Sequence, residues 1–313
     1  MKKKILLREV TDNECRKLLH EKQHRMDFLN PLKQEIFDFV WERLKRMVNS
    51  EMFENEFLFS NDNQYFELLK IQIKINKSIT NPSDTDGGYF NNRELVDGKI
   101  PMPIIKIFTG YHIKSDEIMN TIDHEVTHLY DDWIWQKSGH EPLLKTKDRL
   151  NNVNFLNTVW DGGDDEFEID EFIKSIAYCI YLADKSEQHA FLNQTVTELN
   201  SLGANRANIH TKMKETSSYQ MYTKTLSILK DVLSKHSDNY VNQTYSYLVN
   251  QFGEITIPKP KQTESYKQTL ISWIENICRM FLKRYYSIVQ YYIDTIENGS
   301  KPTNSTANYR NKA

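Results

Sequence analysis

The feature that most restricts the fold is a long amphipathic helix predicted over residues 116–137. Ser115 can cap its start, two acidic residues follow in the first turn, and Gly139 marks its end. Its apolar residues recur every three or four positions, the spacing of one helix face: Ile118, Ile122, Val126, Leu129 and Trp133. This stripe requires a core to pack against, and it leaves His124 and His128 together on another face of the helix.

Composition favours a helical fold with a substantial core. The chain has 313 residues, of which 39% are hydrophobic and 27% charged, enough apolar material for one large domain or two ordinary ones. It contains only 10 Gly and 8 Pro, which favours long helices over many short strands. We therefore expect an α+β fold that is predominantly helical.

Charge and cysteine content exclude several classes of protein. The 40 Lys+Arg and 43 Asp+Glu give a net charge of −3, without the basic excess typical of a dedicated nucleic-acid-binding protein. Cys15, Cys179 and Cys278 form no CxxC pair, which excludes a disulfide framework and a cysteine-based zinc knuckle. The apolar run near the N-terminus is too short for a signal peptide, and no stretch approaches the roughly 18 apolar residues of a membrane span. We expect a soluble, cytoplasmic protein with no nucleic-acid or membrane partner.

In the first half of the chain the spacing of hydrophobic residues changes from that of a helix to that of a strand. A capping box at 11–14 and an Asn30-Pro31 restart predict a pair of helices over residues 11–50. Residues 66–75 then alternate apolar and polar side chains, which predicts a half-buried strand.

Two further segments precede the long helix. Residues 81–99 are rich in turn signals such as Asp86-Gly87-Gly88, and we expect a loop there. Residues 100–108 read as a second strand. Pro101 and Pro103 cannot donate ladder hydrogen bonds, so we expect this strand at the edge of a sheet, beside the 116–137 helix.

The second half is predicted to be helical. An acidic run at 161–166 lacks the ligand spacing of a calcium loop, and the aromatic stretch 264–297 is typical of core or partner-helix packing. We divide the chain into an N-terminal helical segment (1–60), a metal-binding core (61–205), a C-terminal helical region (206–297) and a disordered tail (298–313).

The 116–137 helix contains the motif His124-Glu125-Val126-Thr127-His128, which is HExxH. Imidazoles four residues apart on a helix share a face and can bind one metal ion, and Glu125 lies next to that face, where it can act as a general base. Two imidazoles suit zinc, which needs a third protein ligand and an open position to be catalytic. We expect one Zn²⁺ per chain.

A predicted edge strand followed by an HExxH helix resembles the zincin metallopeptidases. The stretch 124–132 is similar to the active-site helix of uncharacterised, often phage-encoded, zinc peptidases, and the resemblance covers about residues 66–200. It implies a small zincin-like sheet whose edge strand binds an extended peptide substrate. Asp131 and Ile134 stand where the metzincin branch has Gly and His, so that branch is excluded.

In the glutamate-ligand branch, the gluzincins, a Glu from a later helix is the third ligand. Glu187, followed three residues later by Ala190, fits this pattern, with His189 and Glu171 as alternatives. A ligating histidine commonly donates its other ring N–H to a carboxylate, and Asp131 and Asp132 are candidates for that partner. Tyr178 and Tyr181 are candidates for stabilising an oxyanion.

The resemblance therefore implies a zinc metallopeptidase, a hydrolase acting on a peptide or protein substrate with Glu125 as its base. The alternatives are a hydrolase of other carbonyl compounds and a non-catalytic interaction or structural protein that keeps a zincin core. The aromatic C-terminal helices would suit a protein partner.

Overall fold

The structure is a computed structural model that describes residues 23–47, 52–60, 66–76, 85–145, 147–160, 169–261 and 264–298. Within these ranges the fold is α+β and predominantly helical, as expected from the sequence. The capping box at 11–14, the acidic run at 161–166 and almost all of the tail lie outside the described residues.

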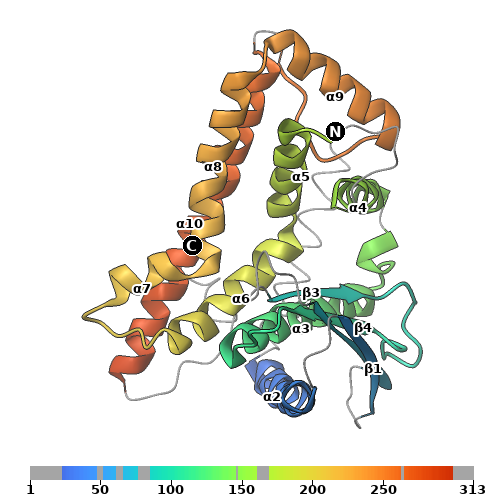
Figure 1. Ribbon diagram of the computed structural model, residues 1–313, viewed down its shortest axis with the longest axis vertical. Coiled ribbons are helices and arrows are strands. Elements are labelled where there is room, and N and C mark those ends of the chain that lie inside the picture. Colours follow the sequence, from blue (N-terminus) through green and yellow to red (C-terminus); the bar gives the residue numbers. More distant parts are fainter. Residues whose placement is uncertain are drawn as a thin grey trace.

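The elements are helices and one small sheet, which lies at the lower right of the view in Figure 1. The N-terminal part contains α2 (Gln23–Arg46), β1 (Met52–Ser60), β2 (Leu68–Asn76), β3 (Thr85–Phe90), β4 (Ile104–Thr109) and α3 (Ser115–Lys137). A 3₁₀ turn, η1 (Leu143–Lys145), leads to α4 (Lys147–Trp160), α5 (Glu171–Ala183) and α6 (Lys185–Ser201). The chain continues with α7 (Ile209–Glu215), α8 (Ser217–Lys235), α9 (Asp238–Phe252) and α10 (Tyr266–Glu297).

The sheet has the strand order β1-β2-β4-β3, with β2 and β4 parallel and the two outer pairs antiparallel. The prediction that residues 100–108 form an edge strand is wrong, because β4 is paired on both sides. Pro101 and Pro103 precede the paired residues and therefore remove no ladder hydrogen bond. Among the described strands, β1 and β3 lie at the edges of the sheet, and β3, the one that packs beside α3, is in the segment predicted to be a loop.

Two more predictions near the N-terminus are corrected. Residues 52–60, assigned to the N-terminal helical segment, form β1. The helix expected to restart at Asn30-Pro31 instead runs through Pro31, which lies inside α2. The side chains that follow Pro31 on one face of α2 are buried against the sheet, and this packing favours a continuous helix.

One hydrophobic core lies between the sheet, α2 and α3. The predicted stripe of α3 is buried in it, together with the inward-facing isoleucines Ile71, Ile73, Ile105 and Ile107 of β2 and β4. Contrary to the prediction, Ser115 is the first residue of α3 and not its cap. Lys114 occupies the N-cap position, without a side-chain capping hydrogen bond. The rigid attachment of α3 to the sheet fixes the direction in which its polar face points.

A second core joins α4, α5 and α6 to the C-terminal helices, and α5, α8 and α10 form the upper arm in Figure 1. It runs from Phe155 to Tyr292 without a break at the predicted boundary between residues 205 and 206. The aromatic stretch of α10 contributes Phe281, Tyr285 and Tyr292 to this core. Its packing role is therefore confirmed for these side chains.

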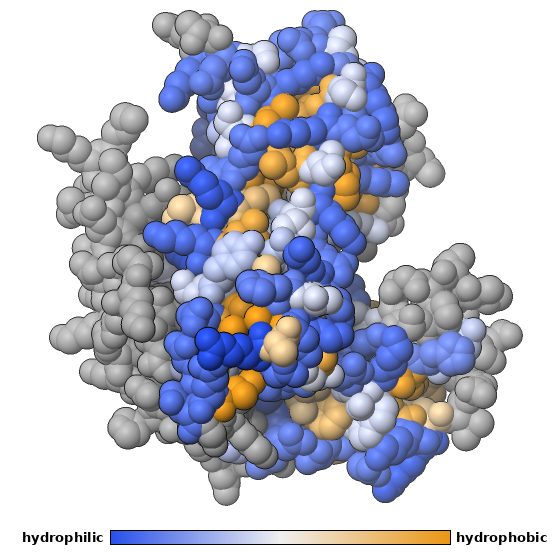
Figure 2. Space-filling view, turned by 90° about the vertical axis from the view of Figure 1, so that its left-hand side faces the viewer, coloured by the Kyte–Doolittle hydropathy of each residue, from blue (hydrophilic) through white to orange (hydrophobic). Residues whose placement is uncertain are grey.

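The surface of the C-terminal helices is mixed. Figure 2 shows hydrophobic side chains in separate patches among hydrophilic ones. Ile228 of α8 and Met280 and Tyr286 of α10 are among the exposed apolar residues. Among the described residues, no helix is both long enough and apolar enough to cross a membrane.

Candidate metal centre

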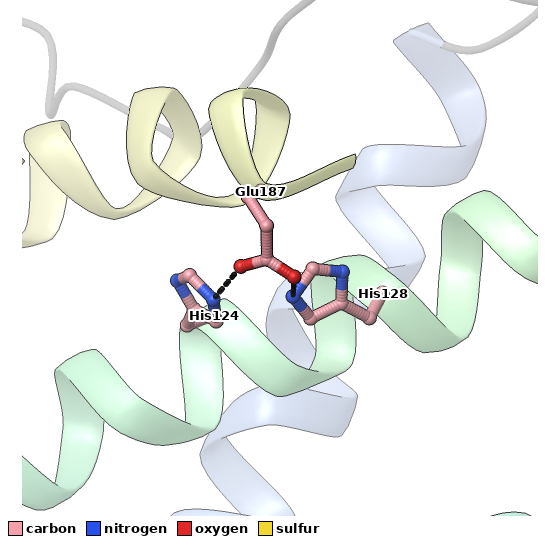
Figure 3. A group of neighbouring side chains, drawn as sticks. All are labelled: His124, His128 and Glu187. Carbon is pink, nitrogen blue, oxygen red and sulfur yellow. Dashed lines mark hydrogen bonds and ion pairs between the residues drawn. The ribbon is translucent and has the colours of Figure 1, made fainter. Parts of the chain in front are cut away.

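The two histidines of the motif lie one helical turn apart on α3. Their ring centroids are 4.8 Å apart, and both side chains are largely buried, with 10% of His124 and 9% of His128 exposed. The apolar stripe faces the sheet, so the imidazoles point away from it toward α6 (Figure 3). This arrangement follows directly from the spacing of the motif.

Helix α6 brings a carboxylate to the imidazoles. Its N-cap is Asp184, whose side chain accepts a hydrogen bond from the Ser186 N–H at 2.7 Å and fixes the first turn. From that turn Glu187 reaches His124 Nε2 with Oε2 at 3.2 Å and His128 Nε2 with Oε1 at 3.4 Å (Figure 3). The structure thus brings together the three residues predicted as metal ligands.

The two alternatives for the third ligand lie elsewhere. His189 Nδ1 pairs with Asp131 Oδ2 at 2.6 Å, and the exposed Glu171 pairs with Lys235 on the surface. Neither belongs to the group of side chains that could hold a metal ion. Among the candidates from the sequence, only Glu187 converges on both imidazoles.

The charges of His128 and Glu187 stabilise each other within this buried cluster. Burial disfavours the charged forms of both His128 and Glu187, but their proximity outweighs it. The Glu187 carboxylate raises the pKa of His128 to about 9, and His128 with His124 holds the pKa of Glu187 well below its usual value. Both Nε2 atoms face carboxylate oxygens, so either a proton or a metal ion must lie between each pair.

The donor set fits zinc. Two imidazole nitrogens and one carboxylate are a common ligand set of catalytic zinc sites, which leave the fourth position open. Ligands that share one tetrahedral centre at zinc distances lie about 3.3–3.6 Å from each other. The two His–Glu separations are near this value, through different carboxylate oxygens, and one donor atom from each of the three residues lies within 4.8 Å of the others. The exposed fraction of the Glu187 side chain, 14%, shows that the centre is not sealed from solvent.

The Nδ1 atoms of both imidazoles face side chains of α6. His124 Nδ1 lies 3.2 Å from Gln194 Oε1, and His128 Nδ1 lies 2.8 Å from Ser186 Oγ. Phe191 packs its ring edgewise against His124, with the centroids 4.7 Å apart. These contacts fix the orientation of both rings.

The prediction that Asp131 or Asp132 accepts a hydrogen bond from His124 or His128 is therefore wrong. Asp131 pairs with His189 and so joins α3 to α6. Asp132 accepts hydrogen bonds from Tyr89 Oη at 2.9 Å, Asn91 Nδ2 at 2.6 Å and the Leu143 N–H at 3.0 Å. Its contact with Tyr89 fastens the edge strand β3 to the motif helix.

Glu125 points toward β3 and is 4% exposed. Burial raises the pKa of its carboxyl to about 7, against the opposing effect of His124 and His128. Gly87 of β3 lies so close that an added Cβ would be 2.7 Å from Glu125 Oε1. The carboxylate is thus held between the metal-binding face of α3 and the edge of the sheet.

The two tyrosines considered for oxyanion stabilisation differ in position. Tyr178 lines a cavity of about 720 Å³ between α4, α5 and α8, and none of His124, His128 and Glu187 lines this cavity. Tyr181 lies beside Glu187: burial, followed by the charge and hydrogen bonding of Glu187, raises the pKa of Tyr181 well above its usual value. Of these two tyrosines, Tyr181 is therefore the one next to the candidate metal centre.

Sequence reasoning missed Ser186 and Gln194. A signal was present in the spacing of α6, because Gln194 lies seven residues after Glu187 and therefore on the same face. Comparisons with protein-family models, with curated proteins and with solved structures returned no match.

Proposed function

We propose that this chain is a zinc-dependent metallopeptidase of the zincin type, with His124, His128 and Glu187 as the metal ligands. The observation that carries the proposal is the convergence of these three donors beside a buried carboxylate, Glu125, that takes no part in the donor set. A purely structural zinc site has no need of such a base.

Zinc bound by these residues would polarise a carbonyl group and acidify a water molecule. Glu125 accepts the proton of the attacking water and delivers it to the leaving nitrogen as the C–N bond breaks. Its position next to the donors, and not among them, leaves its carboxylate available for both transfers. Tyr181, whose side chain hydrogen-bonds to Glu187, would be the hydroxyl available to stabilise an oxyanion at this centre.

The edge strand supports a peptide as the substrate. In the described part of the chain β3 is paired only with β4, and its Gly87 adjoins Glu125. The Gly87 N–H donates to the Asp86 carboxylate at 2.8 Å, and this hydrogen bond is exposed to solvent. An extended peptide that adds to the free side of β3 would pass along the centre.

The test is Glu125→Gln, which keeps the size of the side chain and removes the proton acceptor. Hydrolysis of a mixed peptide library should fall by about 10²–10⁴-fold while the bound zinc stays at one per chain. His124→Ala is the matched variant that should lose the metal as well as the activity.

Two outcomes would contradict the proposal. Equal hydrolysis by the wild type and Glu125→Gln would place the chemistry elsewhere. Full zinc occupancy without hydrolysis in the wild type would instead favour an interaction or structural protein, the alternative expected from the sequence.

A further inference from the structure

Glu198 is a buried acid that lies outside the donor set. It is on α6, three turns after Glu187, and is 4% exposed. Its Oε1 accepts hydrogen bonds from Gln194 Nε2 at 2.9 Å and from the Ser217 backbone N–H at 3.1 Å. Its Oε2 lies 3.3 Å from Ser218 Oγ.

The backbone partner fixes the direction of these hydrogen bonds. A backbone N–H can only donate, so Glu198 Oε1 must be an acceptor. This holds even if the carboxyl is protonated, since the proton can reside on Oε2, next to the Ser218 hydroxyl. Gln194 must therefore turn its NH₂ group toward Glu198 and its carbonyl Oε1 toward His124.

The same logic extends to the imidazole. Gln194 Oε1 is only an acceptor, so the His124 nitrogen that it meets at 3.2 Å, Nδ1, must carry a proton. In the neutral ring the lone pair is then on Nε2, the atom that faces Glu187. A reversed Gln194 amide would favour the opposite tautomer and place a proton on Nε2, where a metal ion would have to bind.

We propose that Glu198 is a positioning residue for the metal centre: through Gln194 it holds His124 in the tautomer whose Nε2 can bind zinc. This inference rests on the proposed function only in taking His124 as a metal ligand. The resulting chain, Ser217 N–H to Glu198 to Gln194 to His124, links the start of α8 to the motif helix α3.

The test measures the zinc affinity of the full chain by competition with a chromophoric chelator. Glu198→Met removes the acceptor and should weaken zinc binding by about 10–100-fold, the usual effect of losing a partner of a ligating histidine. Glu198→Gln is the matched control: its amide oxygen can still accept from Ser217 and Gln194, so it should bind zinc like the wild type. Gln194→Met should weaken binding as Glu198→Met does.

The double variant Glu198→Met with Gln194→Met separates a relay from two independent effects. If Glu198 acts through Gln194, the double variant binds zinc no more weakly than Gln194→Met alone. Circular dichroism checks that each variant is folded. If Glu198→Met does not fold, Glu198→Asp, which withdraws the acceptor by one methylene, replaces it in the comparison.

Three results would overturn the inference: unchanged affinity in Glu198→Met, an equal loss in Glu198→Gln, or additive losses in the double variant. The second would show that the charge of Glu198 matters and the hydrogen-bond direction does not. If the wild-type chain binds no zinc, both this inference and the proposed function are overturned. If the wild type binds zinc but does not hydrolyse peptides, only the proposed function fails, and the zinc affinities still test the inference.

Discussion

Gly87 offers a way to move the proposed base without touching a metal ligand. The residue lies in the edge strand β3, where a Cβ would come within 2.6 Å of Thr121 Cγ2, 2.7 Å of Glu125 Oε1 and 2.9 Å of Glu125 Cγ. Contacts below 3.0 Å are essentially not found for real Cβ atoms, so Gly87→Ala must displace the strand or the two side chains. The end of the Glu125 side chain is the most movable of these groups.

The size of the effect follows from this geometry. Overpacking by one methyl group should lower the stability by about 1–3 kcal/mol. Glu125 is almost fully buried and has little space to move without losing its position, and a misplacement of about 1 Å can lower a rate by about 10²-fold. His124 and His128 of α3 meet Glu187 of α6 on the other side of Glu125, so this donor set should still bind zinc. We therefore expect Gly87→Ala to lower kcat by about 10–10²-fold at unchanged zinc content and nearly unchanged KM.

Gly88→Ala is the matched control on the next residue of the strand. Its Cβ would meet only the Phe90 ring, at 3.0 and 3.3 Å, and this ring is exposed and can turn away. Steady-state hydrolysis, zinc analysis and urea unfolding should be measured for both variants, and for Gly87→Ala with Thr121→Ser, which removes the Thr121 contact. The reasoning fails if Gly87→Ala keeps the wild-type kcat, if it loses zinc together with activity, or if Gly88→Ala is equally impaired.

Two further predictions concern stability. Lys33 of α2 and Asp123 of α3 form a buried ion pair, so Lys33→Met should remove the cation that compensates the buried Asp123 carboxylate and lower the free energy of unfolding by about 3–5 kcal/mol in urea titration. Lys45→Met removes the exposed pair with Glu42 and a surface contact with the Trp41 ring, and it should change the free energy of unfolding by less than about 1 kcal/mol. Equal effects of the two variants would contradict the importance of burial. Zinc at about 100 times its Kd should stabilise the chain by about 2.7 kcal/mol, so treatment with a chelator should lower the melting temperature. An unchanged melting temperature would contradict a site that binds the ion only in the folded state.

The parts of this molecule that were predictable from the sequence depend on local periodicity. The extent of α3 to within one residue, its buried stripe and the shared face of His124 and His128 follow from patterns within one helix, although its N-cap residue was predicted wrongly. Glu187 came from the resemblance to the gluzincins, in which a later helix supplies a glutamate, and the structure places it in the first turn of α6.

The sheet was harder, because the order of strands depends on pairing between distant segments. Asp86, Gly87 and Gly88 have the composition of a turn, yet they pair with β4 in an edge strand. The reason lies in α3: Thr121 and Glu125 occupy the space where a side chain at position 87 would be. A glycine required by the neighbouring helix cannot be distinguished from a turn glycine in one sequence.

The partners of the imidazoles show the same limit within the site. Asp131 and Asp132 are close to His128 along the chain, but a helix sends successive side chains in different directions, and these two contact α6 and β3. The imidazoles point across the gap to α6, so their partners are set by the face of that helix. Glu187, Phe191, Gln194 and Glu198 recur at intervals of three and four residues, the spacing of one helix face. The partners of an HExxH pair are therefore to be sought on the helix that supplies the third ligand, and the residues next to the motif instead hold the surrounding elements in place.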